Sequence, residues 1–304
     1  MKKIEIHTFL PFYYFFVASL ICSCTAPIDI HTRNSEPVVV IYGCLTNEYK
    51  TQYIRITHSS PYFYESDNQA ITDAKVKVTS SQGREYAFDN DVNGYYISQR
   101  RFSALPGVTY RLSVEVDANN DGNIEMYEAE TTPPPIVPAD SIEVKTINIM
   151  GYNHHSLVIY MQDPAETDNF YLFRFLINDS ISNSRISDLL ISNDLLYNGE
   201  YINGANITFF EDGTDQRVVD RNKDNENFFM VKPGDLIRLQ IINIEEGYFN
   251  FIRDCKAEKY GENPFFGGPP SNIYTNLSNG AVGYFSSYCI HEKETVVPEE
   301  TVRP

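Results

Sequence analysis

The sequence predicts an all-β protein with two β-sandwich-like domains in tandem and one short helix in the second. Three observations support this. The chain of 304 residues contains 22 Tyr and 19 Phe but no Trp, and aromatic and β-branched residues favour half-buried strands. Apolar and polar residues alternate in several segments, as in strands with one buried face. Asn, Asp, Gly, Ser and Pro recur about every ten residues, which is typical of turns in all-β folds.

Residues 1–23 have the pattern of a signal peptide. Two lysines follow Met1, and the apolar run FLPFYYFFVASLI spans residues 9–21. This run is shorter than the roughly 20 apolar residues of a transmembrane helix. Ile21-Cys22-Ser23-Cys24 resembles the lipobox of bacterial lipoproteins, so we expect cleavage before Cys24 and a lipid on its thiol. The alternative is an ordinary secretory signal in which both cysteines are incidental.

Residues 24–36 are polar and lack a periodic pattern, which predicts a lipidated tether. Two or three acyl chains anchor a protein stably, because each buried CH₂ contributes about 0.8 kcal/mol. We therefore expect an outer-membrane lipoprotein. Asp29 is the only acidic residue shortly after Cys24, so the acidic run that exports some lipoproteins to the cell surface is lacking. The sequence therefore allows attachment to either the periplasmic or the cell-surface face of the outer membrane.

Residues 37–132 are predicted to form the first sandwich, of the immunoglobulin- or transthyretin-like kind. Val38–Tyr42 is a continuous apolar run, as in a buried strand. Tyr110–Val116 alternates apolar and polar residues, which indicates an antiparallel sheet packed on one side. Turn signals separate the predicted strands at Gln82-Gly83, Asn93-Gly94, Pro106-Gly107 and Asp121-Gly122.

Residues 133–138 contain four prolines and predict a stiff linker, because proline fixes φ and has no backbone donor. Residues 139–292 follow as a second β-rich domain, with strands at 170–177 and 236–244. One helix is predicted from Asn243-x-x-Glu246, which has the form of a capping box. Tyr248, Phe251, Ile252 and Cys255 then recur at helical spacing. Residues 293–304 are charged and contain proline, which predicts a disordered tail.

The charge of the chain excludes one class of partner. The formal net charge is −17, and removal of residues 1–23 leaves 22 basic and 40 acidic residues. Such a field repels nucleic acids and anionic lipid headgroups, and no basic stripe offsets it. We therefore expect no nucleic-acid binding, and solubility is the simplest role for the acidity.

The order of the segments resembles the domain of unknown function 4249 family, whose members are bacterial lipoproteins commonly encoded beside TonB-dependent outer-membrane receptors. The resemblance covers nearly the whole mature chain. The matching stretches are VVVIYGCLT (38–46), ITHSSPYFY (56–64), ITDAKVKVTSSQG (71–83), NGYY (93–96), PGVTYRLSV (106–114), YEA (127–129), DSI (140–142), NFYLF (169–173), Gly234-Asp235 and residues 264–285. It implies a two-domain β architecture and a role beside an outer-membrane uptake receptor, and it implies no known catalytic residues.

Three cysteines remain in the mature body, at positions 44, 255 and 289. An odd number in an oxidising compartment leaves at least one thiol unpaired. Cys255 with Cys289 is the candidate disulfide, because both lie in the carboxy-terminal half. The alternative is that all three are small buried hydrophobic residues.

Residues 117–128 copy the pattern of a calcium-binding loop, with Gly122 at the sixth position. Ca²⁺ takes about six to eight oxygen ligands. The ligands would be Asp117, Asn119, Asp121, the carbonyl of Asn123 and Glu128. The flanking segments are predicted strands rather than the helices of an EF-hand. The alternative is therefore a hairpin tip in which Asn, Asp and Gly suit the turn. No other cofactor is expected.

Catalytic signatures are absent from the sequence. It contains no G-x-S-x-G, H-E-x-x-H, Walker A loop or G-x-G-x-x-G, so we expect no enzyme. Phe265 and Phe266 lie in a Gly- and Pro-rich segment, which is a candidate contact loop for a partner or else a structural loop packed on its own domain.

Two functions follow as hypotheses. The first is a non-catalytic accessory protein that binds a TonB-dependent nutrient-uptake receptor. The second is a stand-alone surface lipoprotein that binds carbohydrate or peptide. The absence of Trp counts somewhat against carbohydrate, since Trp is a large platform for stacking, although Tyr can serve. The ligand itself is not predicted.

Overall fold

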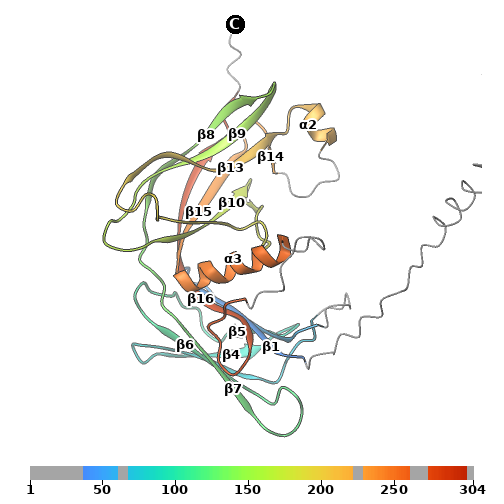
Figure 1. Cartoon of the computed structure of the whole chain (residues 1–304). Helices are drawn as coiled ribbons and strands as arrows, with labels where there is room; N and C mark the ends of the chain where they lie inside the picture. The colour runs from blue at the N-terminus through green and yellow to red at the C-terminus, as the bar shows by residue number, and fades with distance from the viewer. Residues whose placement is uncertain (1–36, 61–67, 222–228, 261–272, 300–304) are drawn as a thin grey trace, which may run out of the picture. The chain divides into compact units, whose positions relative to one another are not determined.

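The chain folds into β-sheets, as the sequence predicts. The computed structural model describes residues 37–60, 68–221, 229–260 and 273–299 (Figure 1). In these ranges one sheet has 12 strands and another has four, and all belong to one compact unit that starts at Pro37. The all-β class and the sandwich arrangement are therefore confirmed.

The amino-terminal strands surround a first core of aliphatic and aromatic side chains. They are β1 (Val39–Thr46), β2 (Tyr53–His58), β3 (Lys75–Ser80), β4 (Glu85–Asn90), β5 (Tyr95–Ser98), β6 (Tyr110–Val116) and β7 (Glu125–Thr131). They pair antiparallel in the order β1-β2-β5-β4-β3-β6-β7. The predicted alternation in β6 is confirmed, because Leu112 and Val114 are buried in the first core while Arg111 is exposed.

The remaining strands build a sandwich around a second core. The four-stranded sheet has the order β14-β13-β9-β8, and the large sheet continues through β15, β10, β11 and β12. Their bounds are β8 (Ala139–Ile149), β9 (Tyr152–Gln162), β10 (Phe170–Ile177), β11 (Ser180–Ile181), β12 (Leu190–Asn193), β13 (Tyr201–Asp212), β14 (Met230–Val231) and β15 (Leu236–Ile244). Phe175 of β10 meets Phe210 of β13 edge-on, with ring centroids 5.1 Å apart. Aromatic pairs favour this geometry, so the contact helps fix the two sheets face to face.

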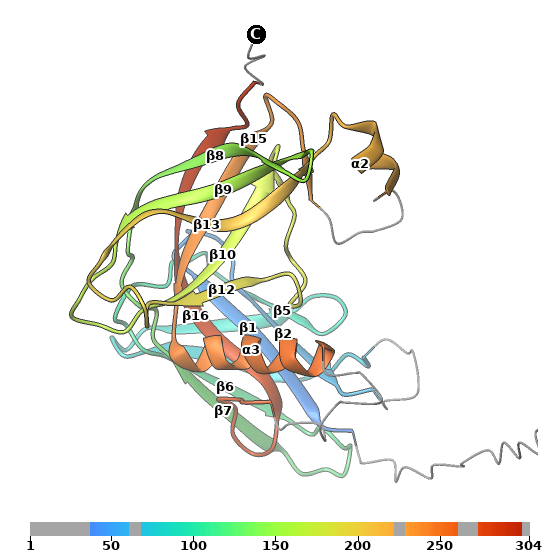
Figure 2. The same ribbon diagram turned by 45° about the horizontal axis from the view of Figure 1, so that its top comes forward.

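The predicted helix is confirmed as α3 (Glu246–Tyr260), which lies beside β16 (Val282–Val296) in both Figure 1 and Figure 2. Tyr248, Phe251 and Ile252 are buried, and they form a third core against the outer face of the large sheet. The capping box is wrong, however. Asn243 belongs to β15, and its side chain accepts a hydrogen bond from the Val137 amide at 2.9 Å.

A second helix, α2 (Gln216–Arg221), was not predicted from the sequence. Among the described residues, no helix is both long enough and apolar enough to cross a membrane.

Strand β16 connects the two parts of the molecule. Its first half pairs in parallel with β1, and its second half pairs antiparallel with β15. Leu277 and Phe285 belong to the first core, whereas Val297 belongs to the second. The chain therefore returns to the first part after it has built the second.

The predicted linker at 133–138 contains no strand, and it leads from Ala129 of the first core to Val137 of the second. The return of β16 is a feature that the predicted division into residues 37–132 and 139–292 does not contain. That residues 37–132 and residues 139–292 form two separate domains stays a prediction.

The predicted disordered tail is wrong for residues 293–299. Residues 293–296 complete β16, and Val297 is buried. The charges that suggested a solvated tail lie on the exposed face of the sheet, where Arg238 pairs with Glu294 at 2.7 Å and with Glu292 at 3.8 Å. The backbone ladder to β15 does not depend on side-chain polarity. Residues 300–304 lie outside the described residues.

Gly283 is required for the parallel pairing of β16 with β1. Its φ is +106°, and a Cβ atom there would lie 2.1 Å from the carbonyl oxygen of Ile41. We expect Gly283→Ala to lower the free energy of unfolding by about 2–4 kcal/mol, measured by urea denaturation. Gly280→Ala is the matched control, because φ is +75° there but no atom lies within 4 Å. Its loss should be about 1 kcal/mol, and equal losses would contradict a steric role for Gly283.

Candidate functional site

A cavity lies between the two sheets, where β10 and β12 face β9 and β13. Its volume is about 310 Å³, at the lower end of the roughly 300–1,000 Å³ of small-molecule pockets. It is lined by Ile159, Met161, Tyr171, Phe173, Leu190, Ile191, Ser192, Asn193, Asp194, Tyr197, Ile202, Ala205, Asn206 and Ile207. The space is large enough for a small ligand, since a cavity of about 150 Å³ holds benzene.

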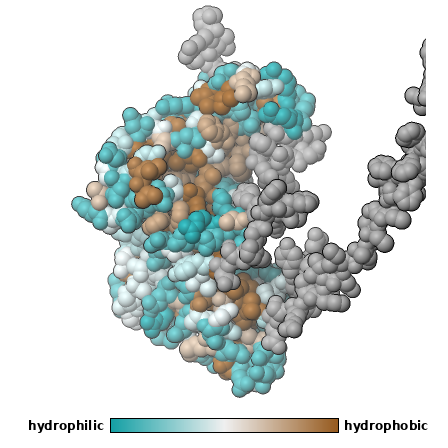
Figure 3. Space-filling view, in the orientation of Figure 1, coloured by the Kyte–Doolittle hydropathy of each residue, from teal (hydrophilic) through white to brown (hydrophobic). Residues whose placement is uncertain are grey.

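The interior of the cavity is apolar because of strand alternation. Tyr171 and Phe173 are two residues apart on β10 and point to the same face of the sheet. Met161 and Ile159 do the same on β9, and all four are buried. Figure 3 shows hydrophobic surface gathered on this part of the molecule. Transfer of an apolar ligand from water into the cavity would therefore be favourable.

Polar groups surround this apolar interior. The Asp194 carboxylate accepts a hydrogen bond from the Asn169 amide at 2.6 Å, and burial raises the pKa of Asp194. Asn206 accepts a hydrogen bond from the Ser156 hydroxyl at 2.6 Å. The side chain of Asn193 has no hydrogen-bond partner among the described residues. Ser192 pairs with Tyr171 and therefore shares the face that borders the cavity. Asn193 pairs with Phe170, and Asn206 lies between the core residues Ala205 and Ile207, so alternation turns both amides away from the apolar interior.

Tyr171 is held in place at the cavity wall. Its hydroxyl donates to the Asp163 carboxylate at 2.6 Å, and the same carboxylate accepts from the Gly199 amide at 3.2 Å. Burial raises the pKa of Tyr171, so the phenol stays neutral. The lining residues named above include no His, Cys, Lys or Arg, and Asp194 already holds a backbone amide. The arrangement offers contacts for binding rather than a nucleophile with its base.

The predicted calcium ligands lie in the β6–β7 hairpin. Asp117 accepts hydrogen bonds from the amides of Asp121 at 3.0 Å and Gly122 at 2.9 Å. The carboxylate of Asp121 accepts from the Asn123 amide at 2.8 Å, and the Asn119 side chain accepts from the Asp121 amide at 3.1 Å. These oxygens therefore hold the turn itself, as Asn and Asp side chains commonly do.

Glu128 does not join the other four predicted ligands. It lies on β7 opposite Ser113. Glu128 is four positions beyond the end of the turn at Ile124, which corresponds to roughly 13 Å along a strand. Glu125 is the acidic residue at the neck of the hairpin, and it accepts from the Ala118 amide at 3.0 Å. Within the described ranges, no three His, Cys, Asp or Glu residues are grouped to hold a metal ion. The five-ligand set is not assembled, and calcium binding by this loop stays a prediction.

The candidate disulfide between Cys255 and Cys289 is wrong, because both thiols are free in the structure, as is that of Cys44. Cys255 packs from α3 towards the face of β16 that carries Tyr288 and Ile290. Cys289 stands between those two residues, so strand alternation points it to the opposite face. Burial raises the pKa of both Cys255 and Cys289 to about 11, which makes them poor nucleophiles.

Cys24, the predicted lipidation site, lies outside the described residues, as do Phe265 and Phe266 of the candidate contact loop.

Sequence reasoning missed the cavity. The residues that line it come mainly from four strands and lie between positions 159 and 207, so no short motif links them. The available signal was the apolar run of β10, which is buried on both faces and therefore must be covered on both.

The chain has a counterpart among known protein families. A family model described as a domain of unknown function (DUF4249) matches residues 25–294. No curated protein matches the chain. Among solved structures, the two fibronectin type-III domain segment from chicken tenascin matches with 12% identity and a TM-score of 0.19, over 68% of this chain and 90% of that one. This TM-score is too low to indicate a shared fold, and the fold is defined by the strand pairing described above.

Ala205 offers a direct test of the cavity, because it is half-buried in the lining. We expect Ala205→Phe to fill part of the cavity and weaken binding of the neutral dye N-phenyl-1-naphthylamine by about tenfold or more, measured by fluorescence titration. Ala87→Phe is the matched control, since Ala87 is exposed on β4. Dye binding that is unchanged in Ala205→Phe would show that the cavity does not accept apolar ligands.

Proposed function

The chain belongs to the DUF4249 family, and from this premise we propose that it is a lipid-anchored, non-catalytic binding module of the outer membrane. In this proposal it works beside a TonB-dependent nutrient-uptake receptor. The observation that carries the proposal is the cavity between the sheets, with an apolar interior and a polar rim. Small-molecule binding sites have this composition.

The tether supports a position close to the membrane. Residues 25–36 join the predicted lipid on Cys24 to the compact unit that begins at Pro37. At roughly 3.3–3.6 Å per residue, they span at most about 40 Å. A partner in the same bilayer then meets the module at a high effective concentration, so even a modest contact surface suffices for association.

The receptor partnership is what the resemblance implies, because members of the family are commonly encoded beside TonB-dependent receptors. The net charge of −17 is consistent with it, since a strongly acidic module is repelled by anionic headgroups and stays available above the surface. A stand-alone carbohydrate- or peptide-binding lipoprotein is the second candidate. It is favoured by Tyr197, which is 48% exposed at the cavity and offers a ring for stacking.

Lipidation is tested at the two cysteines of the lipobox. We expect metabolic labelling with an alkyne fatty acid to mark the wild-type chain and the Cys22→Ser control, because cleavage before residue 24 leaves residue 22 in the removed peptide. Cys24→Ser should lose the label and leave the membrane fraction. A labelled Cys24→Ser variant would contradict the predicted anchor.

The receptor partnership is tested by purification from mildly solubilised outer membranes, with a tag placed after Pro304. We expect a TonB-dependent receptor to co-purify in stoichiometric amount, identified by mass spectrometry. The Cys24→Ser variant is the control for the contribution of the anchor, since it lacks the shared membrane. A chain that purifies alone, under conditions that preserve other lipoprotein–receptor pairs, would favour the stand-alone candidate.

A further inference from the structure

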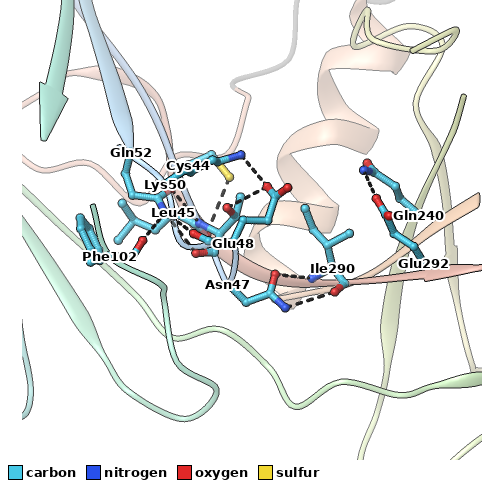
Figure 4. Close-up of polar contacts among 11 residues, drawn as sticks. Cys44, Leu45, Asn47, Glu48, Lys50, Gln52, Phe102, Gln240, Ile290 and Glu292 are labelled. Carbon is cyan, nitrogen blue, oxygen red and sulfur yellow. Dashed lines mark hydrogen bonds and ion pairs between the residues drawn. The ribbon is translucent and has the colours of Figure 1, made fainter. Parts of the chain in front are cut away.

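A second pocket lies where the loop after β1 meets the outer face of β10, β15 and β16. Its volume is about 170 Å³, and it is lined by Cys44, Thr46, Glu48, Lys50, Tyr53, Arg174, Ile181, Gln240, Tyr288 and Ile290. Figure 4 shows Glu48 and Lys50 on one side, Gln240 on the other, and Ile290 between them. Unlike the cavity between the sheets, this pocket contains positively charged side chains.

Arg174 is the unusual member of this pocket. It lies on β10 opposite Gln240, and its guanidinium carbon is 5.7 Å from the centroid of the Tyr288 ring. Its Nε is buried and has no hydrogen-bond partner, and no described residue forms an ion pair with it. Arg238, on the neighbouring strand β15, contrasts with it, because Asp179 and Glu294 lie 2.9 and 2.7 Å from its guanidinium.

The neighbours of Arg174 do not neutralise its charge. Burial raises the pKa of Cys44 and Tyr288, and it raises the pKa of Tyr42 to about 12. All three groups therefore stay uncharged at neutral pH. A charge that is mostly buried and lacks an ion-pair partner destabilises the fold. Among the described residues, no acidic side chain lies close enough to offset this cost.

The other charges of the pocket are already paired. Lys50 lies 2.5 Å from the Glu48 carboxylate, which also accepts from the Thr46 hydroxyl at 3.2 Å. Two cations and one carboxylate line the pocket, so one positive charge is in excess. This excess matches a monoanion better than a dianion such as hydrogen phosphate.

The walls of the pocket are fixed before any ligand arrives. Asn47 accepts from the Ile290 amide at 2.9 Å and donates to the Ile290 carbonyl at 3.1 Å, which joins the loop to β16 (Figure 4). Gln52 accepts from the Thr46 amide at 3.1 Å and donates to the Phe102 carbonyl at 2.8 Å. A preorganised site loses less conformational entropy on binding.

We propose that this pocket binds one small monocarboxylate, with its carboxylate on the Arg174 guanidinium and its apolar part against Ile181 and Ile290. The planar fork of arginine matches a carboxylate in a bidentate pair. The pocket is distinct from the cavity between the sheets, so this inference does not depend on the proposed receptor partnership.

The test is calorimetric titration of the full chain in detergent micelles, with sodium benzoate as the probe and benzamide as its uncharged isostere. We expect benzoate to bind about tenfold or more tightly than benzamide. Arg174→Met should weaken benzoate binding by about tenfold or more. The unfolding temperature of this variant without benzoate should not fall, because the substitution removes an unpaired charge. Arg238→Met is the matched control, since Arg238 is already paired, and it should bind benzoate as the wild type does.

Equal binding of benzoate and benzamide would overturn the proposal. Unchanged benzoate binding in Arg174→Met, or an equal loss in Arg238→Met, would do the same, because binding would then not depend on the Arg174 fork. If Arg174→Met does not fold, Arg174→Lys decides, since it keeps the charge but loses the bidentate geometry. Arg174→Lys should weaken benzoate binding by about tenfold, and an unchanged affinity would contradict the assignment.

Discussion

The pairing of β16 with both β1 and β15 is the constraint on which the rest of the structure depends. A single strand runs parallel to β1 and then antiparallel to β15, so the two parts of the molecule share one backbone ladder. Side-chain contacts support the same junction. The Ser287 amide donates to the Thr131 hydroxyl at 2.8 Å, and Glu245 accepts from the Thr132 amide at 2.9 Å. Burial raises the pKa of Glu245, as expected for a carboxyl enclosed between the two parts.

Strand β10 links the two candidate binding sites through its alternation. Tyr171 and Phe173 point into the cavity between the sheets, whereas Arg174 points to the outer pocket. The sequence of β10 is apolar on both faces except at Arg174, as expected for a strand covered on both sides. One strand therefore contributes to both an apolar site and a charged one.

Local sequence patterns predicted the elements whose signals are local. The bounds of β10 and β15 agree with the predicted strands, and the predicted turns contain Gly83, Gly94, Gly107 and Gly122 with positive φ. Features that depend on distant pairing were missed. The charged residues 293–296 resemble a tail because their partner strand β15 lies more than fifty positions earlier. The capping-box pattern at Asn243 occurs within a strand. The predicted disulfide was wrong because the positions of Cys255 and Cys289 in the sequence do not determine which face of β16 carries Cys289. Arg174 carried a usable signal, as a lone cation within an apolar run.

If β16 makes the two parts one cooperative unit, their slowest amides must exchange through the same global unfolding. Hydrogen exchange of the full chain at increasing urea concentrations, followed by mass spectrometry, measures this most directly. Peptides from β1 and β2 and peptides from β10 and β15 should reach the same opening free energy with the same dependence on urea. Exchange of either group through a separate opening, at clearly lower free energy than the other, would show that the two parts unfold independently and would contradict the central role of β16.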